Sequence, residues 1–99
     1  MRYSFSMIKT FSCSETEKIF SGNRSKKLPV NIQQTARRKL RMLNNALELS
    51  DLRVSPANRL ELLKGNRKGQ YSIRINNQYR ICFVWNNGNI NSVEIVDYH

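Results

Sequence analysis

Residues 71–85 read YSIRINNQYRICFVW, and this stretch decides the fold class. Apolar residues recur at every second position on both sides of the Asn76-Asn77 pair, as in two half-buried strands joined by a turn. A further alternating run follows the Asn87-Gly88 pair. Pairs of this kind supply the positive φ that tight hairpins require. The pattern therefore predicts an antiparallel meander of three strands.

A long amphipathic helix is predicted before these strands. Pro29 precedes it, and its apolar residues form one stripe at helical spacing: Ile32, Ala36, Leu40, Leu43 and Leu47. A shorter helix is expected earlier, because Ser14 followed by Glu17 fits a capping box. That helix should end near Ser21-Gly22.

The remaining segments complete an α+β domain. Residues 7–11 predict a short first strand, and 50–59, which hold Ser, Asp, Pro and Asn, are expected to be irregular. The expected fold is a short N-terminal strand, two helices, and then an antiparallel β-meander packed on the long helix. Its 99 residues suit one domain, 1–99, of which residues 1–6 could be an N-terminal appendage.

The chain is strongly basic. Seventeen Lys and Arg against seven Asp and Glu give a net charge of +10 and a pI near 10.2. A domain this basic usually acts near a polyanion: RNA, DNA, an anionic membrane face or an acidic protein. Solubility alone needs less, since a net charge of about 8 is enough for a small domain.

Several function classes are disfavoured. The apolar stretches are far shorter than the roughly 20 residues that span a bilayer, and the N-terminus lacks the apolar centre of a secretory signal. Cys13 and Cys82 form no CxxC pair, so we interpret them as reduced packing residues of a cytoplasmic protein. The only His is the last residue and the carboxylates are scattered, so we expect no membrane partner, metal or other cofactor.

The predicted long helix carries a run of cations beside its apolar stripe. These side chains could face RNA or a partner protein, although a solvated helix back explains the same run. As candidate RNA-binding residues we name Arg37, Arg38, Lys39 and Arg41.

A second group of cations lies in the glycine-containing segment 63–69 and in the hairpin. The segment could be a plain surface turn, and it lacks the GK[ST] ending of a nucleotide-binding loop. Period-two alternation places Arg74 and Arg80 together on the sheet face opposite the core, where an Arg fork suits a phosphodiester. We expect Lys64 and Arg80 to hold a scissile phosphate, with further RNA contacts from Arg67, Lys68 and Arg74.

The chain ends in Asp97-Tyr98-His99, directly after a predicted strand. A frayed tail is one interpretation; the other is the proton-transfer part of a site. RNA cleavage without a metal needs a base for the 2′-OH, an acid for the leaving 5′ oxygen, and cations for the transition state. His99 suits acid or base work near neutral pH. Tyr98 could stack on a base or move a proton, and Asp97 could orient a cation or the His.

Four segments of the chain resemble the HigB branch of the RelE superfamily of toxin–antitoxin endonucleases. They are residues 7–11, the segment LELLKGNR at 60–67, the hairpin SIRINNQYRICF at 72–83, and the closing VEIVDYH at 93–99. The hairpin and the closing segment together carry the resemblance, which covers nearly everything from Met7 to His99.

The resemblance implies a RelE-like fold and a type II toxin that cuts mRNA in the ribosomal A site and so inhibits translation. It implies a HigA-type helix-turn-helix antitoxin as partner, with operator DNA bound only through that antitoxin. By matching motif positions, it assigns functional roles to Lys64, Arg80, Asp97, Tyr98 and His99.

The chain departs from the family at two positions. Some members carry His where this chain has Glu61, and Arg where it has Asn76. His99 is therefore the only imidazole, so either Tyr98 shares the proton work or intrinsic activity is low.

Two other functions remain as alternatives. One is a non-catalytic RNA- or ribosome-binding protein that uses the same cations for affinity only. The other is a DNA-binding repressor subunit, which is disfavoured because no second helix follows the long one after a short turn.

Overall fold

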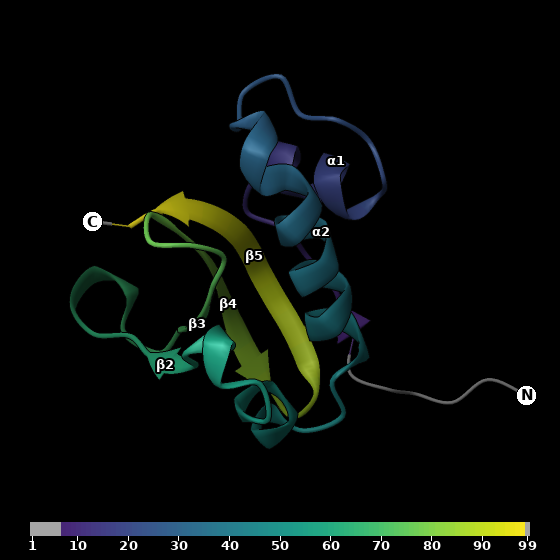
Figure 1. The fold of residues 1–99 in the computed structure, drawn as a ribbon. Coiled ribbons are helices and arrows are strands. Elements are labelled where there is room, and N and C mark those ends of the chain that lie inside the picture. The colour runs from purple at the N-terminus through teal and green to yellow at the C-terminus, as the bar shows by residue number, and fades with distance from the viewer. Residues whose placement is uncertain (1–6, 99) are drawn as a thin grey trace, which may run out of the picture.

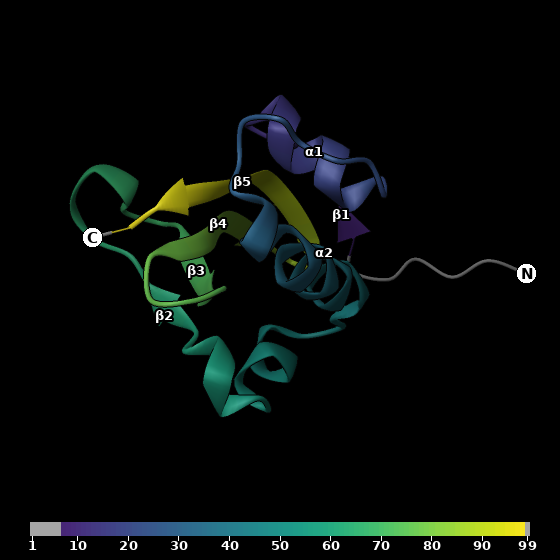
Figure 2. The same cartoon turned by 45° about the horizontal axis from the view of Figure 1, so that its top comes forward.

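The structure, a computed structural model, describes residues 7–98. Two helices pack on one side of a five-stranded sheet, as Figures 1 and 2 show. Three short 3₁₀ helices lie in the connections, at Leu49–Arg53, Pro56–Asn58 and Gly65–Arg67. The helices and strands are β1 (Met7–Ile8), α1 (Ser14–Phe20), α2 (Val30–Asn45), β2 (Glu61–Leu62), β3 (Tyr71–Arg74), β4 (Tyr79–Asn86) and β5 (Asn89–Asp97).

The sheet has the order β1-β5-β4-β3-β2. Strands β2 to β5 pair in antiparallel fashion, which confirms the predicted meander, and the two-residue β1 adds to β5 in parallel. A register shift between Cys82 and Val84 places two β5 residues opposite one β4 residue. Ser92, in this bulge, has a φ of 57°. The extra residue lets both Ile90 and Val93 face the core, where each is fully buried.

The core lies between the sheet and the helices. Ile73, Ile81 and Phe83 from the sheet are fully buried, and so are most residues of the predicted stripe on α2. Leu47 is the exception. Helix α2 ends at Asn45, so Leu47 lies beyond the helix with 57% of its surface exposed, and Ala46 is buried in its place. The prediction for Leu47 was therefore wrong.

Two local predictions fail for identifiable reasons. The N-cap of α1 is Cys13, not Ser14, and no side chain caps the helix, so the capping box is wrong. The β4–β5 turn has positive φ at Asn87 and Gly88 as predicted, but the β3–β4 turn has none at Asn76 or Asn77. There the Oδ1 of Asn76 accepts hydrogen bonds from two backbone N–H groups further along the turn, which replaces a positive-φ turn by an Asx turn.

The segment between α2 and β2 is more ordered than predicted. Its two 3₁₀ helices pack on each other, and the second, Pro56–Asn58, also packs on β3; Leu52 and Asn58 are both fully buried. Arg59 then adopts the left-handed conformation, with a φ of 45°. Within the described residues, no helix is both long and apolar enough to cross a bilayer.

Candidate functional site

Arg80 is the centre of a polar cluster on the sheet face opposite α2. It lies near the start of β4, where its Cα faces that of Arg74 across the hairpin, so both side chains leave the same face as predicted. The Nε of Arg80 donates to Ser72 Oγ at 2.7 Å, and its Nη2 donates to the Arg59 carbonyl at 2.6 Å. Only 11% of the Arg80 side chain is exposed. Its guanidinium is therefore held in one orientation before any ligand arrives.

Tyr98 lies over this guanidinium. Val96 is the register partner of Arg80, and Tyr98 follows two residues later on the same face. The Arg80 Cζ lies 5.7 Å from the centroid of the Tyr98 ring, a cation–π distance, while 41% of Tyr98 remains exposed. The Tyr98 backbone N–H donates to the Gln78 carbonyl at 2.6 Å, so the chain is not frayed at this residue. His99 lies outside the described residues.

Glu61 is a site residue that the sequence analysis missed. Its Oε1 lies 3.7 Å from Arg80 Nη2, and 54% of its side chain is exposed. Strand β2 pairs Glu61 with Ser72, which carries the carboxylate to the edge of the Arg80 cluster. A usable signal was present, because Glu61 is the only acidic residue among the cations of 59–69. This carboxylate is the described group best placed to accept a proton beside Arg80.

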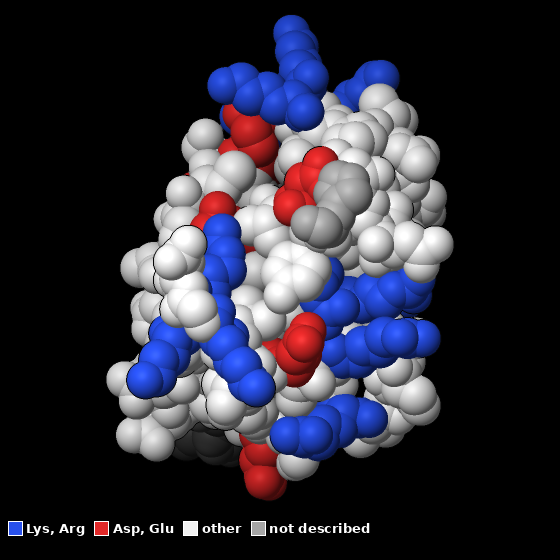
Figure 3. Space-filling model, turned by 90° about the vertical axis from the view of Figure 1, so that its left-hand side faces the viewer, with Lys and Arg blue, Asp and Glu red and all other residues white. Residues whose placement is uncertain are grey.

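The loop between β2 and β3 contributes exposed cations on the same side of the molecule. Lys64 and Lys68 are exposed, and together with Leu62 they border a hollow of about 420 Å³. Figures 1 and 2 show this loop and the C-terminal end of β5 on the same side. Figure 3 views that side and shows Lys and Arg side chains spread over it, with a few acidic side chains between them. An anionic chain reaching Arg80 would meet Lys64 and Lys68 nearby.

Three of the predicted site residues, Arg67, Arg74 and Asp97, have contacts within the protein away from Arg80. Arg67 forms an ion pair of 3.0 Å with Glu94, which ties the loop to β5 and leaves Arg67 little freedom to bind RNA. Arg74 donates from Nη2 to Asn77 Oδ1 at the hairpin turn. Asp97 pairs in register with Tyr79, on the opposite face from Arg80, and its Oδ2 accepts from Gln78 Nε2 at 3.1 Å. The register therefore does not place Asp97 beside the Arg80 guanidinium, and its predicted role toward His99 stays a prediction.

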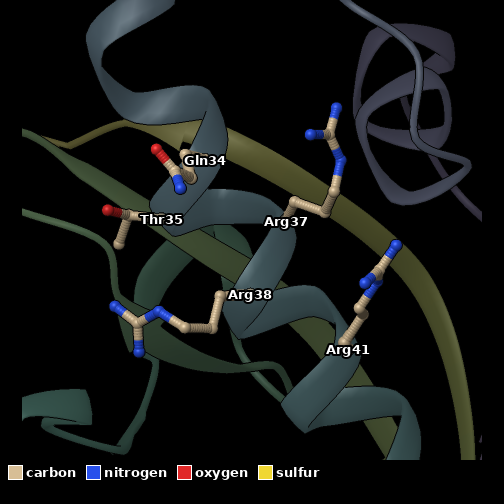
Figure 4. A pocket seen from close by; sticks show the side chains of 5 residues that line it. All are labelled: Gln34, Thr35, Arg37, Arg38 and Arg41. Carbon is tan, nitrogen blue, oxygen red and sulfur yellow. The ribbon is translucent and has the colours of Figure 1, made fainter.

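The helix cations divide into two kinds. Arg38 and Arg41 are exposed, and with Arg37 they line an open hollow of about 490 Å³ on α2 (Figure 4). Arg37 has a structural contact as well, because its Nε donates to the Ile19 carbonyl at 2.7 Å and its Nη2 to the Asn23 carbonyl at 3.0 Å. It thereby fastens α1 and the following loop to α2.

Lys39, predicted to bind RNA, is buried instead. It is 5% exposed, and its Nζ donates to Asn58 Oδ1 in the interior. Burial lowers the pKa of Lys39, and the positive charges of Arg38 and Arg74 lower it further. A side chain so placed cannot contact RNA, so the prediction for Lys39 was wrong.

This arrangement can bind and polarise a phosphodiester. Arg80 offers an oriented guanidinium, Glu61 a carboxylate for proton transfer, and Tyr98 an exposed ring for a base. Within residues 7–98, no three His, Cys, Asp or Glu side chains lie close enough together to hold a metal ion.

Comparison with known proteins identifies the family of this chain. Residues 9–99 match the family described as the RelE-like toxin of the type II toxin–antitoxin system HigB. This match covers most of the chain. The chain belongs to this family. It is therefore a HigB-like toxin, and its RelE-like fold, two helices and a mixed five-stranded sheet, agrees with the expected α+β class.

Individual relatives are consistent with this assignment. The HigB-like toxin is 48% identical over 65 residues to Toxin HigB-1 of Vibrio cholerae serotype O1, a match that covers 66% of this chain and 68% of that protein. It is 39% identical over 72 residues to an uncharacterised protein of Haemophilus influenzae, covering 73% and 71% of the two chains.

Two solved structures share its fold. Both are complexes of YoeB with YefM from Staphylococcus aureus, one of them a heterotetrameric toxin–antitoxin complex. The matched chains have TM-scores of 0.54 and 0.50 at 25% and 28% identity, and each match covers 100% of this chain and 99% of the other.

Proposed function

We propose that this HigB-like toxin is a ribosome-dependent mRNA endonuclease that inhibits translation. The observation that carries the proposal is the cluster of Arg80, Glu61 and Tyr98 on one sheet face. RNA cleavage without a metal needs a base, an acid and oriented cations, and in this cluster Glu61 is the proposed base, Arg80 the oriented cation and the Tyr98 hydroxyl a candidate acid. Family membership supports the toxin role, and the resemblance supports mRNA in the ribosomal A site as the substrate.

In the proposed reaction, the 2′-OH of one nucleotide attacks the adjacent phosphorus and the 5′ oxygen of the next nucleotide leaves. Glu61 accepts the proton of the 2′-OH, and Arg80 stabilises the charge that develops on the phosphate oxygens. Proton delivery to the leaving oxygen falls to His99 or Tyr98. The products are a 2′,3′-cyclic phosphate, or the 3′-phosphate formed when it opens, and a 5′-OH.

Substrate binding would alter the Glu61–Arg80 ion pair. The two groups lie 3.7 Å apart, and Glu61 is more than half exposed, so their attraction is modest. A bound phosphate gives Arg80 a stronger partner and leaves the carboxylate available to the 2′-OH. Glu61 and Arg80 therefore contact each other in the free protein, and Glu61 becomes available as the base once RNA is bound.

Affinity for RNA is proposed to come largely from exposed cations outside this cluster. Residues 9–45 carry nine Lys and Arg against two Glu, so much of the positive charge belongs to the helical half of the chain. Arg38 and Arg41 on α2, and Lys64 and Lys68 beside the cluster, are the proposed phosphate contacts. Phosphate contacts set affinity and position rather than sequence preference.

An antitoxin is the proposed protein partner. The two solved complexes that share this fold pair YoeB with YefM, which supports a bound antitoxin for this chain. We propose a HigA-type helix-turn-helix protein, with operator DNA contacted only through it, in the cytoplasm where mRNA is translated.

Mapping of 5′ ends on translating ribosomes tests the proposal. The wild type should produce new mRNA ends within A-site codons, and Arg80→Ala should lose them while keeping most ribosome affinity. Arg41→Ala is the matched control, since it removes one exposed cation from α2 and should weaken binding without changing the cut positions. Ribosome binding by the wild type with no cleavage by any of the three proteins would favour the non-catalytic alternative.

A further inference from the structure

A buried set of hydrogen bonds connects α2 with residues 58–61, the segment that contacts Arg80. Lys39 Nζ donates to Asn58 Oδ1, and the amide of Asn58 donates to the Leu52 carbonyl at 3.0 Å and to Met42 Sδ at 3.2 Å. Asn58 is fully buried, and its side-chain oxygen and nitrogen both have partners. This link has no role in the chemistry described so far.

Asn58 lies just before Arg59 and Glu61, two of the residues that contact Arg80. Arg59 follows it in the left-handed conformation, and the Arg59 carbonyl accepts from Arg80 Nη2 at 2.6 Å. Glu61, two residues later, provides the carboxylate 3.7 Å from the same nitrogen. The position of both contacts therefore depends on how firmly residues 58–61 are held.

We infer that Lys39 and Asn58 are positioning residues that fix the 58–61 segment and, through it, the orientation of Arg80. This inference rests on the proposed function, because orientation of Arg80 matters only if Arg80 contacts the reacting phosphate.

The cost of burying Lys39 supports this role. Packing alone would be satisfied by Met, which has a similar unbranched stem and no charge to desolvate. A Met at this position would leave Asn58 Oδ1 buried without its donor, and an unsatisfied buried acceptor would loosen the segment. Lys39 supplies a directional hydrogen bond to Asn58 that an apolar side chain cannot supply. Asn58 is next to Arg59, whose left-handed backbone conformation is unfavourable for a residue other than glycine.

The experiment reads the orientation of Arg80 without using activity. In a ¹⁵N-labelled protein, the Arg80 Nε–H that donates to Ser72 gives its own signal, whose exchange with solvent reports how tightly the guanidinium is held. Lys39→Met should speed that exchange at least about tenfold, the change expected from losing one buried hydrogen bond. Backbone amides of β4 and β5 should keep their protection.

Two further variants complete the test. Arg38→Met removes the neighbouring exposed cation from α2 and should leave the Arg80 signal unchanged. Met42→Leu conserves volume but removes one acceptor of the Asn58 amide, so it should fold and should speed exchange less than Lys39→Met.

The outcomes are distinct. Unchanged Arg80 exchange in folded Lys39→Met would overturn the inference, as would an equal rise in Arg80 and in all β4–β5 amides. If Lys39→Met does not fold, Met42→Leu decides: faster Arg80 exchange supports the inference and unchanged exchange overturns it. If Arg80 loosens as expected but the wild type never cleaves mRNA, the positioning role stands and the proposed function fails.

Discussion

Replacing Arg80 with Lys keeps the positive charge but removes the planar fork that bridges Ser72 and Arg59. In the wild type, Nε donates to Ser72 Oγ and Nη2 donates to the Arg59 carbonyl. The remaining N–H groups of the guanidinium can bind a phosphate while these two anchoring hydrogen bonds are kept. A Lys ammonium has a single nitrogen on a flexible four-carbon stem, and it cannot bond both anchors and a phosphate in the fixed geometry of the guanidinium. One oriented donor to a transition state is worth about 10²–10³ in rate, so cleavage by Arg80→Lys should fall by about that factor.

The assay is single-turnover cleavage of an mRNA bound to ribosomes, with ribosome binding measured in parallel. Affinity should stay within about threefold, because the net charge is unchanged and the exposed cations remain. Arg41→Lys, at an exposed α2 position, is the matched control and should cleave like the wild type. Cleavage by Arg80→Lys within about threefold of the wild type would refute the reasoning, since charge alone would then suffice.

Three other perturbations have defined outcomes. Glu61→Gln removes the proposed base but keeps the size of the side chain, so single-turnover cleavage should fall by about 10²–10⁴ with ribosome affinity unchanged or higher. Arg37→Met loses the hydrogen bonds to the Ile19 and Asn23 carbonyls, which fasten α1 and the following loop to α2, and denaturant unfolding should show a loss of about 2 kcal/mol in the free energy of unfolding. A hydrogen bond from Ser25 and then one from Lys18 hold the pKa of Glu15 below its usual 4.5, so this carboxylate stabilises the fold above pH 4.5 and less as pH falls below it. The difference in unfolding free energy between wild type and Glu15→Gln should therefore narrow on acidification.

These predictions have clear contradicting results. Full cleavage by Glu61→Gln would remove the carboxylate from the mechanism. Unchanged stability of Arg37→Met would mean that its two carbonyl contacts form no net stabilising link. A constant difference between wild type and Glu15→Gln across the acidic range would mean that the folded and unfolded pKa values of Glu15 are equal.

The sheet was predictable because its signal is local. Alternation in 71–85 and the Asn87-Gly88 pair define strands and a turn within a few residues of each other, and burial of Ile73 and Ile81 follows from the same period. The parallel pairing of β1 with β5 joins residues about 80 positions apart. No short-range pattern encodes such a pairing, so it could not be predicted.

The site was only partly predictable. Arg80 and Tyr98 lie on one face by alternation alone, but Glu61 reaches them through a two-residue strand that has no period to detect. The prediction for Lys39 was wrong because its position in the helical stripe decides its burial, despite its charge. Position 39 is three residues after Ala36 and four before Leu43, which is stripe spacing, and a Lys on the stripe needs a buried acceptor that only the distant Asn58 supplies.

The most direct test of the mechanism is to remove the nucleophile from the substrate. An mRNA carrying a single 2′-deoxynucleotide at the mapped cleavage position is placed in the ribosomal A site and exposed to the wild-type protein. Attack by the 2′-OH predicts that this bond stays intact while the all-ribose mRNA is cut and ends in a 2′,3′-cyclic phosphate or 3′-phosphate. Cleavage of the 2′-deoxy substrate at the same position would contradict the mechanism.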